Sequence, residues 1–291
     1  MAKKEKDSLP GKQAMPHPFD EESKERLQQR VGRIHRKLLV LSGKGGVGKS
    51  TVAANLAISL AMEGKEVGLL DIDVHGPSIP GLLGLKEGRI MEGLDGLEPV
   101  NMGGNLKVMS IGFMIQNPED PVIWRGPMKF HLIQQFLRDV SWGDLDFLVV
   151  DSPPGTGDEP LSVAQLLGPG AEAIIVTTPQ SIAVDDVRRC VTFCRKVNLA
   201  VLGVVENMSG FICPECGAEI QIFKKGGGEE MARQMDVPFL GRVPLDPTVV
   251  VDSDAGRPYV YHHAEAPAAR AFAGIVSGLM VNETAADDPE K

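Results

Sequence analysis

The sequence predicts an α/β protein built on a doubly wound, mostly parallel sheet in a single domain. Seven short apolar runs recur along the 291 residues, and they are apolar nearly throughout, as strands covered on both faces are. Helical patterns lie between several of these runs, and such alternation implies parallel strands joined by helices. No linker rich in Pro, Gly or Ser divides residues 37–282. We therefore expect one domain over that range.

The predicted elements follow in chain order. Strands are expected at residues 38–42, 67–73, 106–112, 146–152, 173–178, 200–207 and 238–244. Helices are expected at residues 49–63, 127–140, 181–197 and 264–280. In sheets of this kind ligands bind beyond the carboxyl ends of the strands, so chemistry is expected in the residues that follow each run.

Both ends of the chain differ in composition from the middle. Residues 1–36 are predicted to be an N-terminal arm, disordered over the first 20 residues and partly helical over residues 21–36. Residues 283–291, within NETAADDPEK, are predicted to be a flexible acidic tail.

Composition and charge limit the class of protein. Hydrophobic residues make up 43% and charged residues 24%, as in soluble globular proteins. There is no apolar run of about 18 residues and no apolar stretch near the N-terminus, so we expect a cytoplasmic protein with no membrane partner. Residues 1–40 hold ten Lys and Arg against six Asp and Glu, a net +4. The whole chain carries −9, which disfavours nucleic acid as a partner.

A phosphate-binding loop follows the first predicted strand. The loop fits G-x-x-x-x-G-K-[ST] between a strand and a helix, the context in which such loops bind nucleotides. Its residues are Gly43, Lys44, Gly45, Gly46, Val47, Gly48, Lys49, Ser50 and Thr51. Glycines let backbone N–H groups surround phosphate oxygens, and the helix N-terminus adds partial positive charge. Lys49 is expected to neutralise the β- and γ-phosphates, and the Ser50 hydroxyl to ligate Mg²⁺.

Lys44 is a second lysine that this pattern does not require. The stretch KGGVGKS resembles the deviant Walker A loop of the MinD, ParA and nitrogenase iron protein class. The resemblance implies that Lys44 reaches the nucleotide of a partner subunit, so that hydrolysis depends on dimerisation. A solvated loop lysine is the alternative.

Two acidic loops follow other strands. Asp71 and Asp73 end one predicted strand, and Asp151 ends another in the arrangement of a Walker B motif, where the carboxylate lies near Mg²⁺. Resemblance to the same class implies that Asp73 orients the attacking water, with Asp71 supporting it; either carboxylate position could also hold the water shell of the metal. An ordinary turn uses Asp as well, so the spacing alone is weak.

ATP is the expected nucleotide. Nothing in the sequence matches the guanine-reading pattern N-K-x-D, and the three loops together favour an ATPase over a passive nucleotide binder. By the same resemblance, Asn207 corresponds to the adenine-binding asparagine of the class. A turn at the end of a strand is the alternative for Asn207.

A pair of cysteines, Cys213 and Cys216, has the spacing of a metal-binding knuckle. A knuckle supplies two ligands, whereas a tetrahedral zinc or an iron-sulfur cluster usually needs four. Cys190 and Cys194 share the apolar stripe of a predicted helix, which indicates core packing. A symmetric dimer would complete four thiolates by pairing two copies of the knuckle.

A series of motifs runs along the chain in a fixed order: KGGVGKST, DIDVHGPS, WRGPM, DSPPGTGD, ENMSGFICPECG and IFKKGGGEEMA. This series resembles the Mrp/ApbC family of iron-sulfur cluster carrier ATPases. The resemblance implies a homodimer that holds a labile [4Fe-4S] cluster between its paired knuckles and passes it to apo iron-sulfur proteins, using ATP. It implies that Cys213 and Cys216 are the cluster ligands, and that Ser50, Asp73 and Asp151 surround Mg²⁺.

Other classes of protein remain open on the sequence. A MinD- or ParA-like positioning ATPase with structural zinc at the knuckle would use the same loops, although the acidic end of the chain differs from a basic membrane-binding helix. A reductase resembling the nitrogenase iron protein would use separated cysteines. His75, His262 and His263 are further candidate ligands, for which loop or surface positions are the alternative.

Overall fold

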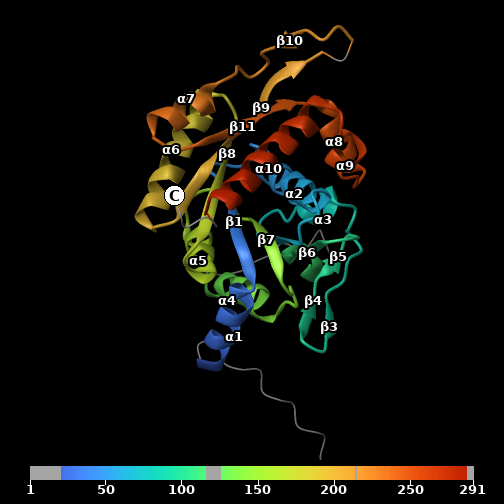
Figure 1. Cartoon of the computed structure of the whole chain (residues 1–291), viewed down its shortest axis with the longest axis vertical. Coiled ribbons are helices and arrows are strands. Elements are labelled where there is room, and N and C mark those ends of the chain that lie inside the picture. The colour runs from blue at the N-terminus through green and yellow to red at the C-terminus, as the bar shows by residue number, and fades with distance from the viewer. Residues whose placement is uncertain (1–20, 116–125, 214, 287–291) are drawn as a thin grey trace, which may run out of the picture.

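A central sheet organises the protein. The structure, a computed structural model, describes residues 21–115, 126–213 and 215–286, and side chains as far as residue 281. Within those residues nine strands form one sheet, in the order β10-β9-β8-β1-β7-β2-β6-β5, with β11 pairing beside β9 (Figure 1). Every pairing among β1, β2, β6, β7, β8, β9 and β11 is parallel, whereas β5 and β10 run antiparallel to their neighbours.

All seven predicted strands are present. They are β1 (Ile34–Ser42), β2 (Val67–Asp71), β6 (Leu106–Ser110), β7 (Leu145–Asp151), β8 (Ala171–Thr177), β9 (Ala200–Ile212) and β11 (Phe239–Leu245). The short strands β3 (Met91–Gly93), β4 (Gly96–Glu98), β5 (Val100–Asn101) and β10 (Glu219–Ile220) were not predicted. Strands of two or three residues carry too short a pattern to be distinguished from loops. The expected doubly wound, mostly parallel α/β fold is confirmed.

Helices cover both faces of the sheet. The four predicted helices are α2 (Lys49–Met62), α4 (Gly126–Asp139), α6 (Ser181–Lys196) and α10 (Pro267–Ala286). The structure adds α1 (Glu21–Gly32), α3 (Ile79–Leu82), α5 (Asp158–Leu167), α7 (Gly227–Gln234), α8 (Pro247–Asp254), α9 (Tyr259–His262) and a 3₁₀ turn at Ile111–Met114. Helix α2 connects β1 to β2, toward one edge of the sheet. Helices α4, α5 and α6 connect β6 to β7, β7 to β8 and β8 to β9, toward the other edge. Right-handed crossovers therefore place α2 on the opposite face from the other three.

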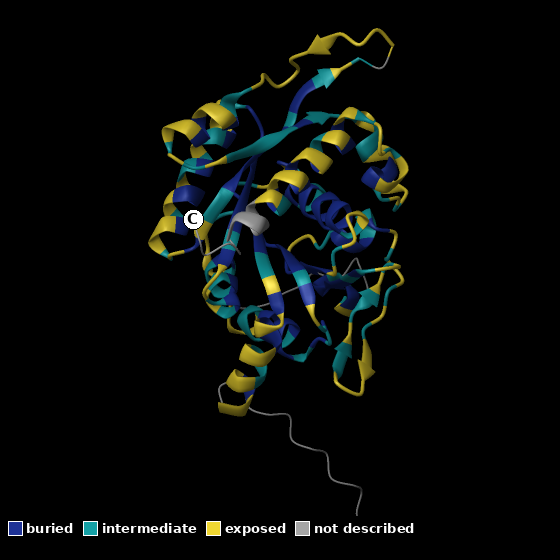
Figure 2. Ribbon diagram, viewed as in Figure 1, coloured by how far each residue is buried: buried dark blue, intermediate teal, exposed yellow. Residues whose placement is uncertain are grey.

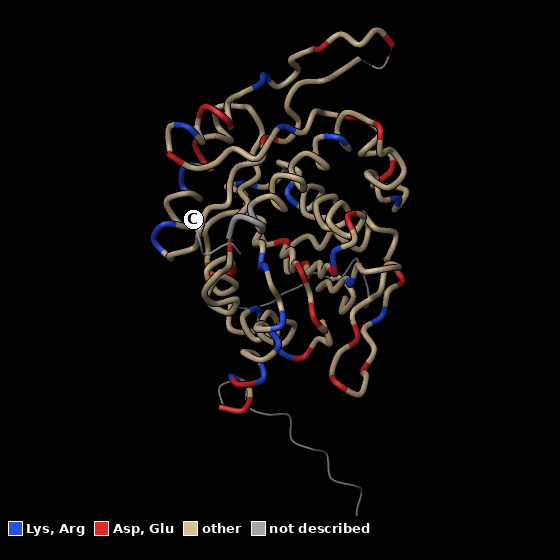
Figure 3. The backbone as a smooth tube through the Cα atoms, viewed as in Figure 1, with Lys and Arg blue, Asp and Glu red and all other residues tan. Residues whose placement is uncertain are grey.

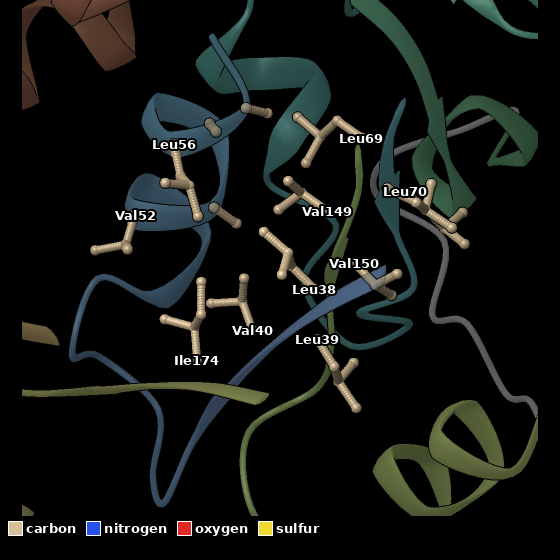
Figure 4. Close-up of a cluster of buried hydrophobic side chains, with 14 of the residues drawn as sticks. Leu38, Leu39, Val40, Val52, Leu56, Leu69, Leu70, Val149, Val150 and Ile174 are labelled. Carbon is tan, nitrogen blue, oxygen red and sulfur yellow. The ribbon is translucent and has the colours of Figure 1, made fainter. Parts of the chain in front are cut away.

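The core lies on both sides of the parallel strands. Successive residues of β1 and β7 point to opposite faces, and both sets are fully buried over residues 38–41 and 147–150 (Figure 4). One side packs the apolar residues of α2 against the sheet, as Val52 and Leu56 show beside Leu38 and Val149 (Figure 4). Figure 2 shows the resulting pattern, with dark buried strands inside a more exposed helical layer. This two-sided burial explains why the strands are apolar nearly throughout rather than alternating.

The N-terminal part of the folded body begins earlier than the sequence indicated. Strand β1 starts at Ile34, so the sheet extends before residue 37, where the domain was predicted to begin. Helix α1 packs against α4, and its Arg30 forms an ion pair with Asp95 at 2.9 Å. Residues 21–32 are therefore part of the packed structure. The predicted disorder of residues 1–20 lies outside the described residues.

The C-terminal part is anchored by α10, which packs on β11 and on α2. The helix extends through residue 286, so the first residues of the predicted flexible tail are helical. Residues 287–291 lie outside the described part of the chain. In the described residues no helix is long and apolar enough to cross a bilayer.

Two glycines make a close crossing between α3 and α8. Gly84 and Gly256 follow these helices with φ of +69° and +65°. A Cβ on Gly256 would lie 2.5 Å from the Cα of Gly84, and a Cβ on Gly84 would lie 2.6 Å from the carbonyl oxygen of Gly256. The crossing therefore requires glycine at both positions.

Candidate nucleotide site and cysteine arm

Three loops meet at the carboxyl edge of the sheet. They follow β1, β2 and β7, which are neighbours there, and the register pairs Asp71 directly with Asp151. The backbone N–H of Gly155 donates to the carbonyl oxygen of Ser42 at 2.8 Å, which ties the loop after β7 to the end of β1. The sheet order thus brings together residues that are far apart in the sequence, such as Asp71 with Asp151 and Ser42 with Gly155.

The phosphate loop has the conformation that its glycines allow. Gly46 and Gly48 both have φ of +79°, a region that other residues rarely adopt. A Cβ on Gly43 would lie 2.5 Å from backbone atoms of Asp186 in α6, so this glycine permits a close approach of two segments. The loop borders an open cavity of about 230 Å³, lined also by Asp73, Ser78 and Pro154.

Lys49 lies among carboxylates at the base of this cavity. Its Nζ donates to Asp151 Oδ1 in a buried ion pair, and it lies 4.0 Å from Asp73 Oδ2. The side chains of Lys49 and Asp151 are 6% and 0% exposed. Burial raises the pKa of Asp151, while the Lys49 ammonium opposes that rise. Lys49 therefore compensates a charge that would otherwise be buried alone.

Asp71 supports the loop from within the core. Its Oδ1 accepts from the backbone N–H of Asp73 at 3.0 Å, and its Oδ2 accepts from the hydroxyl of Ser110 at 2.9 Å and the N–H of Ile79 at 3.3 Å. Burial, together with the neighbouring charge of Asp151, raises the pKa of Asp71 to about 8. With its oxygens occupied and no exposure, Asp71 shapes the loop and does not face the cavity.

The residues expected at Mg²⁺ have the chemistry to hold that ion. Asp151 Oδ2 is buried and makes no hydrogen bond within the part of the chain that the structure describes, and Asp151 also lies within hydrogen-bonding reach of Ser50. A buried carboxylate oxygen without a partner beside a hydroxyl suits a hard cation. Ser50 and Asp151 would hold the ion, with Asp73 next to it. There Mg²⁺ would neutralise charge on the phosphates.

The other two predicted nucleotide residues also lie at the loop. Asn207, at 7% exposure, donates from Nδ2 to the carbonyl oxygen of Val47 at 2.9 Å. Lys44 is half-buried in the cavity wall, and its ammonium makes no ion pair with any described residue. Contact of Asn207 with adenine and of Lys44 with a partner's nucleotide remain predictions.

The two cysteines of the knuckle lie on an arm away from the phosphate loop. Strand β9 continues five residues beyond its predicted end and pairs with β10 in an antiparallel hairpin, which projects beyond the body of the protein (Figure 1). Cys213 is half-buried and Cys216 exposed, at the turn of this hairpin. Figure 2 shows the tip of the arm in the colours of exposed and intermediate residues.

The turn is shaped to hold a thiolate. The N–H of Gly217 donates to the carbonyl oxygen of Cys213 at 2.9 Å, and Gly217 has φ of +73°. Hydrogen bonds from the backbone N–H groups of Cys216 and Glu215 lower the pKa of the Cys213 thiol. A thiolate is the form that ligates metals, so this turn favours a metal-binding state.

The remaining candidate ligands lie elsewhere. Cys190 and Cys194 are fully buried in α6, and burial raises the pKa of both thiols to about 12, which confirms their expected place in the core. His75 and His262 are exposed, and His263 lies 2.7 Å from Asp252. Over the described residues, no group of three or more Cys, His, Asp or Glu side chains is arranged to hold a metal ion.

One residue near the site was not identified from the sequence. Glu206 precedes Asn207 and is fully buried, where its carboxylate accepts from the N–H groups of Gly226 and Gly228 at the start of α7. The signal for it was a charged residue directly after the apolar run at residues 200–205, inside the predicted strand. The contact itself joins positions 20 residues apart, which the sequence pattern does not reveal.

The fold and the loop define a P-loop nucleotide-binding protein of the deviant Walker A type. The chain belongs to the ParA family: the family model described as NUBPL iron-transfer P-loop NTPase matches residues 33–280. This confirms the membership expected from the motif series.

Curated relatives cover nearly the whole chain. The protein is 48% identical to a cytosolic Fe-S cluster assembly factor NUBP2 homolog of Trichoplax adhaerens, over 89% of this chain and 100% of the relative. It is 49% identical to cytosolic Fe-S cluster assembly factor NUBP2 of Gallus gallus, over 86% of this chain and 93% of the relative.

Solved structures agree with this placement. A nucleotide-binding protein of Archaeoglobus fulgidus in complex with ADP and with cobalt superposes with a TM-score of 0.73 at 42% identity, covering 82% of this chain and 93% of that one. The cell division ATPase MinD of Pyrococcus furiosus superposes with a TM-score of 0.61 at 24% identity, over 85% and 99% of the two chains, and shows the fold alone.

Proposed function

We propose that this protein is an ATP-dependent carrier of iron-sulfur clusters. Two copies hold a labile [4Fe-4S] cluster between their paired knuckles and transfer it to apo iron-sulfur proteins. The names of the curated relatives, which describe cytosolic Fe-S cluster assembly factors, support both this activity and a cytosolic location.

The observation that best supports this proposal is that the projecting arm provides only part of a metal site. Cys213 and Cys216 provide two thiols, and the described residues contain no third candidate ligand grouped with them. A [4Fe-4S] cluster is usually held by four thiolates. Because a twofold axis repeats every ligand, two copies of the arm supply four. A cluster at an exposed arm is also accessible to a recipient protein, as a carrier requires.

Apolar side chains around the arm support contact with a second copy. The exposed fractions of Ile212, Ile220, Ile222 and Phe223 are 40%, 49%, 51% and 37%. Neighbouring exposed apolar residues on a soluble protein commonly mark an interaction surface. Around a cluster they would also exclude water. By contrast, Figure 3 shows acidic and basic positions interspersed over much of the described body.

Nucleotide hydrolysis serves the loading or transfer step in this proposal. Lys49 and the loop N–H groups bind the phosphates, Asp73 orients the attacking water, and Asn207 contacts the adenine. Lys44 acts on the nucleotide of the second copy, so that ATP binding and dimerisation are linked. The ADP complex of the Archaeoglobus fulgidus protein supports nucleotide binding at this loop.

Anaerobic reconstitution tests the cluster. The full chain is incubated with ferrous iron and sulfide, desalted, and analysed for iron, acid-labile sulfide, absorbance and mass in solution. We expect a brown dimer with about four irons per dimer, and loss of that iron in Cys213→Ala and in Cys216→Ala. Cys194→Ala is the matched control, because its thiol is buried in α6. The control should keep the full iron content.

Transfer is measured by incubating the loaded dimer with an apo [4Fe-4S] enzyme and following recovery of its activity, with and without Mg·ATP. A colourless protein that retains zinc alone would contradict the proposal and favour a structural zinc knuckle. Iron that persists in Cys213→Ala and Cys216→Ala would place the cluster elsewhere.

A further inference from the structure

Lys129 joins two loops of the nucleotide site from outside the phosphate-binding cavity. It lies in the first turn of α4, and its Nζ donates to Glu159 Oε1 at 2.6 Å. The same Nζ lies 3.0 Å from His75 Nε2. The Lys129 side chain is only 11% exposed and that of Glu159 21%. This burial makes the pair stronger than a solvent-exposed one.

Each partner of Lys129 is attached to one of the acidic loops. The backbone N–H of His75 donates to Asp73 Oδ1 at 3.2 Å, in the loop that follows β2. Glu159 is the second residue of α5, directly after the loop that begins at Asp151. A continuous chain of contacts therefore runs from Asp73 through Lys129 to the end of the other loop.

The chemistry of the three side chains suits a specific bridge between the two loops rather than a chance contact. An ammonium has donors only, so the contact is a hydrogen bond in the His75 tautomer whose Nε2 accepts. The Lys129 hydrogen bond also holds the pKa of the Glu159 carboxyl below its usual value, which keeps the carboxylate charged. Lys129 thus has two polar partners, on different segments.

The contact between Lys129 and Glu159 borders a cavity of about 220 Å³ between α4 and α5. The cavity is lined also by Gly126, Ile133 and Ser162.

We propose that Lys129 is a positioning residue that couples the loop carrying Asp73 to the loop carrying Asp151, so that both respond together to nucleotide. The inference rests on the proposed use of ATP. Loops that contact the γ-phosphate and its metal commonly change order with the nucleotide state. A side chain that bridges two such loops biases both toward one arrangement, and its loss lets each respond alone.

Hydrogen exchange on the full chain tests the coupling without requiring turnover. Exchange is followed at residues 71–79 and 151–158, with and without Mg²⁺ and a non-hydrolysable ATP analogue. In the unmodified protein both segments should gain protection. In Lys129→Met the segment at residues 71–79 should exchange about tenfold faster in the bound state, while residues 43–51 keep their protection. Lys129→Arg should behave as the unmodified protein.

The matched control is Lys86→Met. Lys86 is an exposed lysine after α3, close in sequence to the same loop, and it makes no ion pair with any described residue. This variant should show the unmodified exchange pattern in all segments.

Kinetics provide a readout that a purely structural role would not move. For ATP hydrolysis, Lys129→Met should lower kcat about tenfold and leave KM within about twofold, because the side chain positions loops and does not line the phosphate cavity. Glu159→Gln, an isosteric change, removes the charge of one partner and leaves the His75 contact, so it should lower kcat by less than Lys129→Met does. The double variant should be no slower than Lys129→Met, since that change already removes the contact that Glu159→Gln weakens.

The coupling is overturned if both segments keep their protection in Lys129→Met and the kcat of this variant stays within twofold of that of the unmodified protein. Failure of the proposed function has a different signature: an unmodified protein that takes up no iron, or hydrolyses no ATP. Hydrogen exchange with the analogue still decides the coupling in that case. If the analogue protects neither segment of the unmodified protein, both the coupling and the proposed use of ATP are wrong.

Discussion

Substitution of Lys49 by Met tests the electrostatics of the site in the absence of nucleotide. Methionine has a similar length and no charge, so the change removes the cation and largely retains the volume. In the folded protein Lys49 is paired with Asp151, whose side chain is fully buried. The variant therefore leaves Asp151 beside Asp71 with no compensating charge in contact.

The magnitude follows from the burial of the pair. Removal of one partner of a buried ion pair costs about 3–5 kcal/mol, because an uncompensated charge stays in the interior. We expect the free energy of unfolding of Lys49→Met to fall by about 3 kcal/mol at pH 8. For a protein of this size that lowers the melting temperature by roughly 10 °C.

The loss should shrink as the pH falls. Burial raises the pKa of Asp151 in the folded state above the value of about 3.9 in an unfolded chain, so the folded state binds the proton more tightly. Acidification toward the unfolded-state value therefore favours folding, and more strongly once the Lys49 charge is absent. At pH 5 the difference between the variant and the unmodified protein should therefore be smaller than at pH 8.

Urea unfolding of the nucleotide-free protein in EDTA, at pH 5, 6.5 and 8, measures this dependence. The control is Lys44→Met, in the same loop, where no ion pair with a described residue is lost; its stability should change by less than about 0.5 kcal/mol. A loss in Lys49→Met that is the same at pH 5 and pH 8 would refute the electrostatic reasoning and indicate a packing defect instead.

Two further predictions concern the body of the protein. Gly256→Ala should lower the free energy of unfolding, measured in urea, by about 3 kcal/mol, because the φ of +65° at Gly256 and its contact with Gly84 both exclude a Cβ. Gly274→Ala, in an open position of α10, should instead stabilise the protein by up to about 1 kcal/mol. Equal losses of stability in the two variants would contradict this argument. Burial raises the pKa of the Cys190 and Cys194 thiols to about 12, so both should resist iodoacetamide at pH 8 in the native protein and react only after unfolding. Mass spectrometry counts the alkylated thiols. Rapid alkylation of either cysteine in the native state would show that α6 opens.

The sequence by itself determined the class of fold and the position of the phosphate loop. Strands buried on both faces are apolar nearly throughout, and a phosphate loop needs glycine, lysine and a hydroxyl at fixed spacing, so both are visible in a short window. The core placement of Cys190 and Cys194 was equally local, because the periodicity of one helix indicates its buried face.

The tertiary structure alone decided how these pieces interact. The pairing of Lys49 with Asp151, the support of the loop by Asp71 and the bridge made by Lys129 all join residues from different strands or helices. The order of strands in the sheet sets those distances, and no local pattern encodes that order. The same holds for the arm: β9 was expected to end near Asn207, but pairing with β10 extends it to Ile212 and carries the cysteines away from the body. Strand pairing is a contact between distant segments, so only the folded chain shows that the paired cysteines and the phosphate loop lie at separate places.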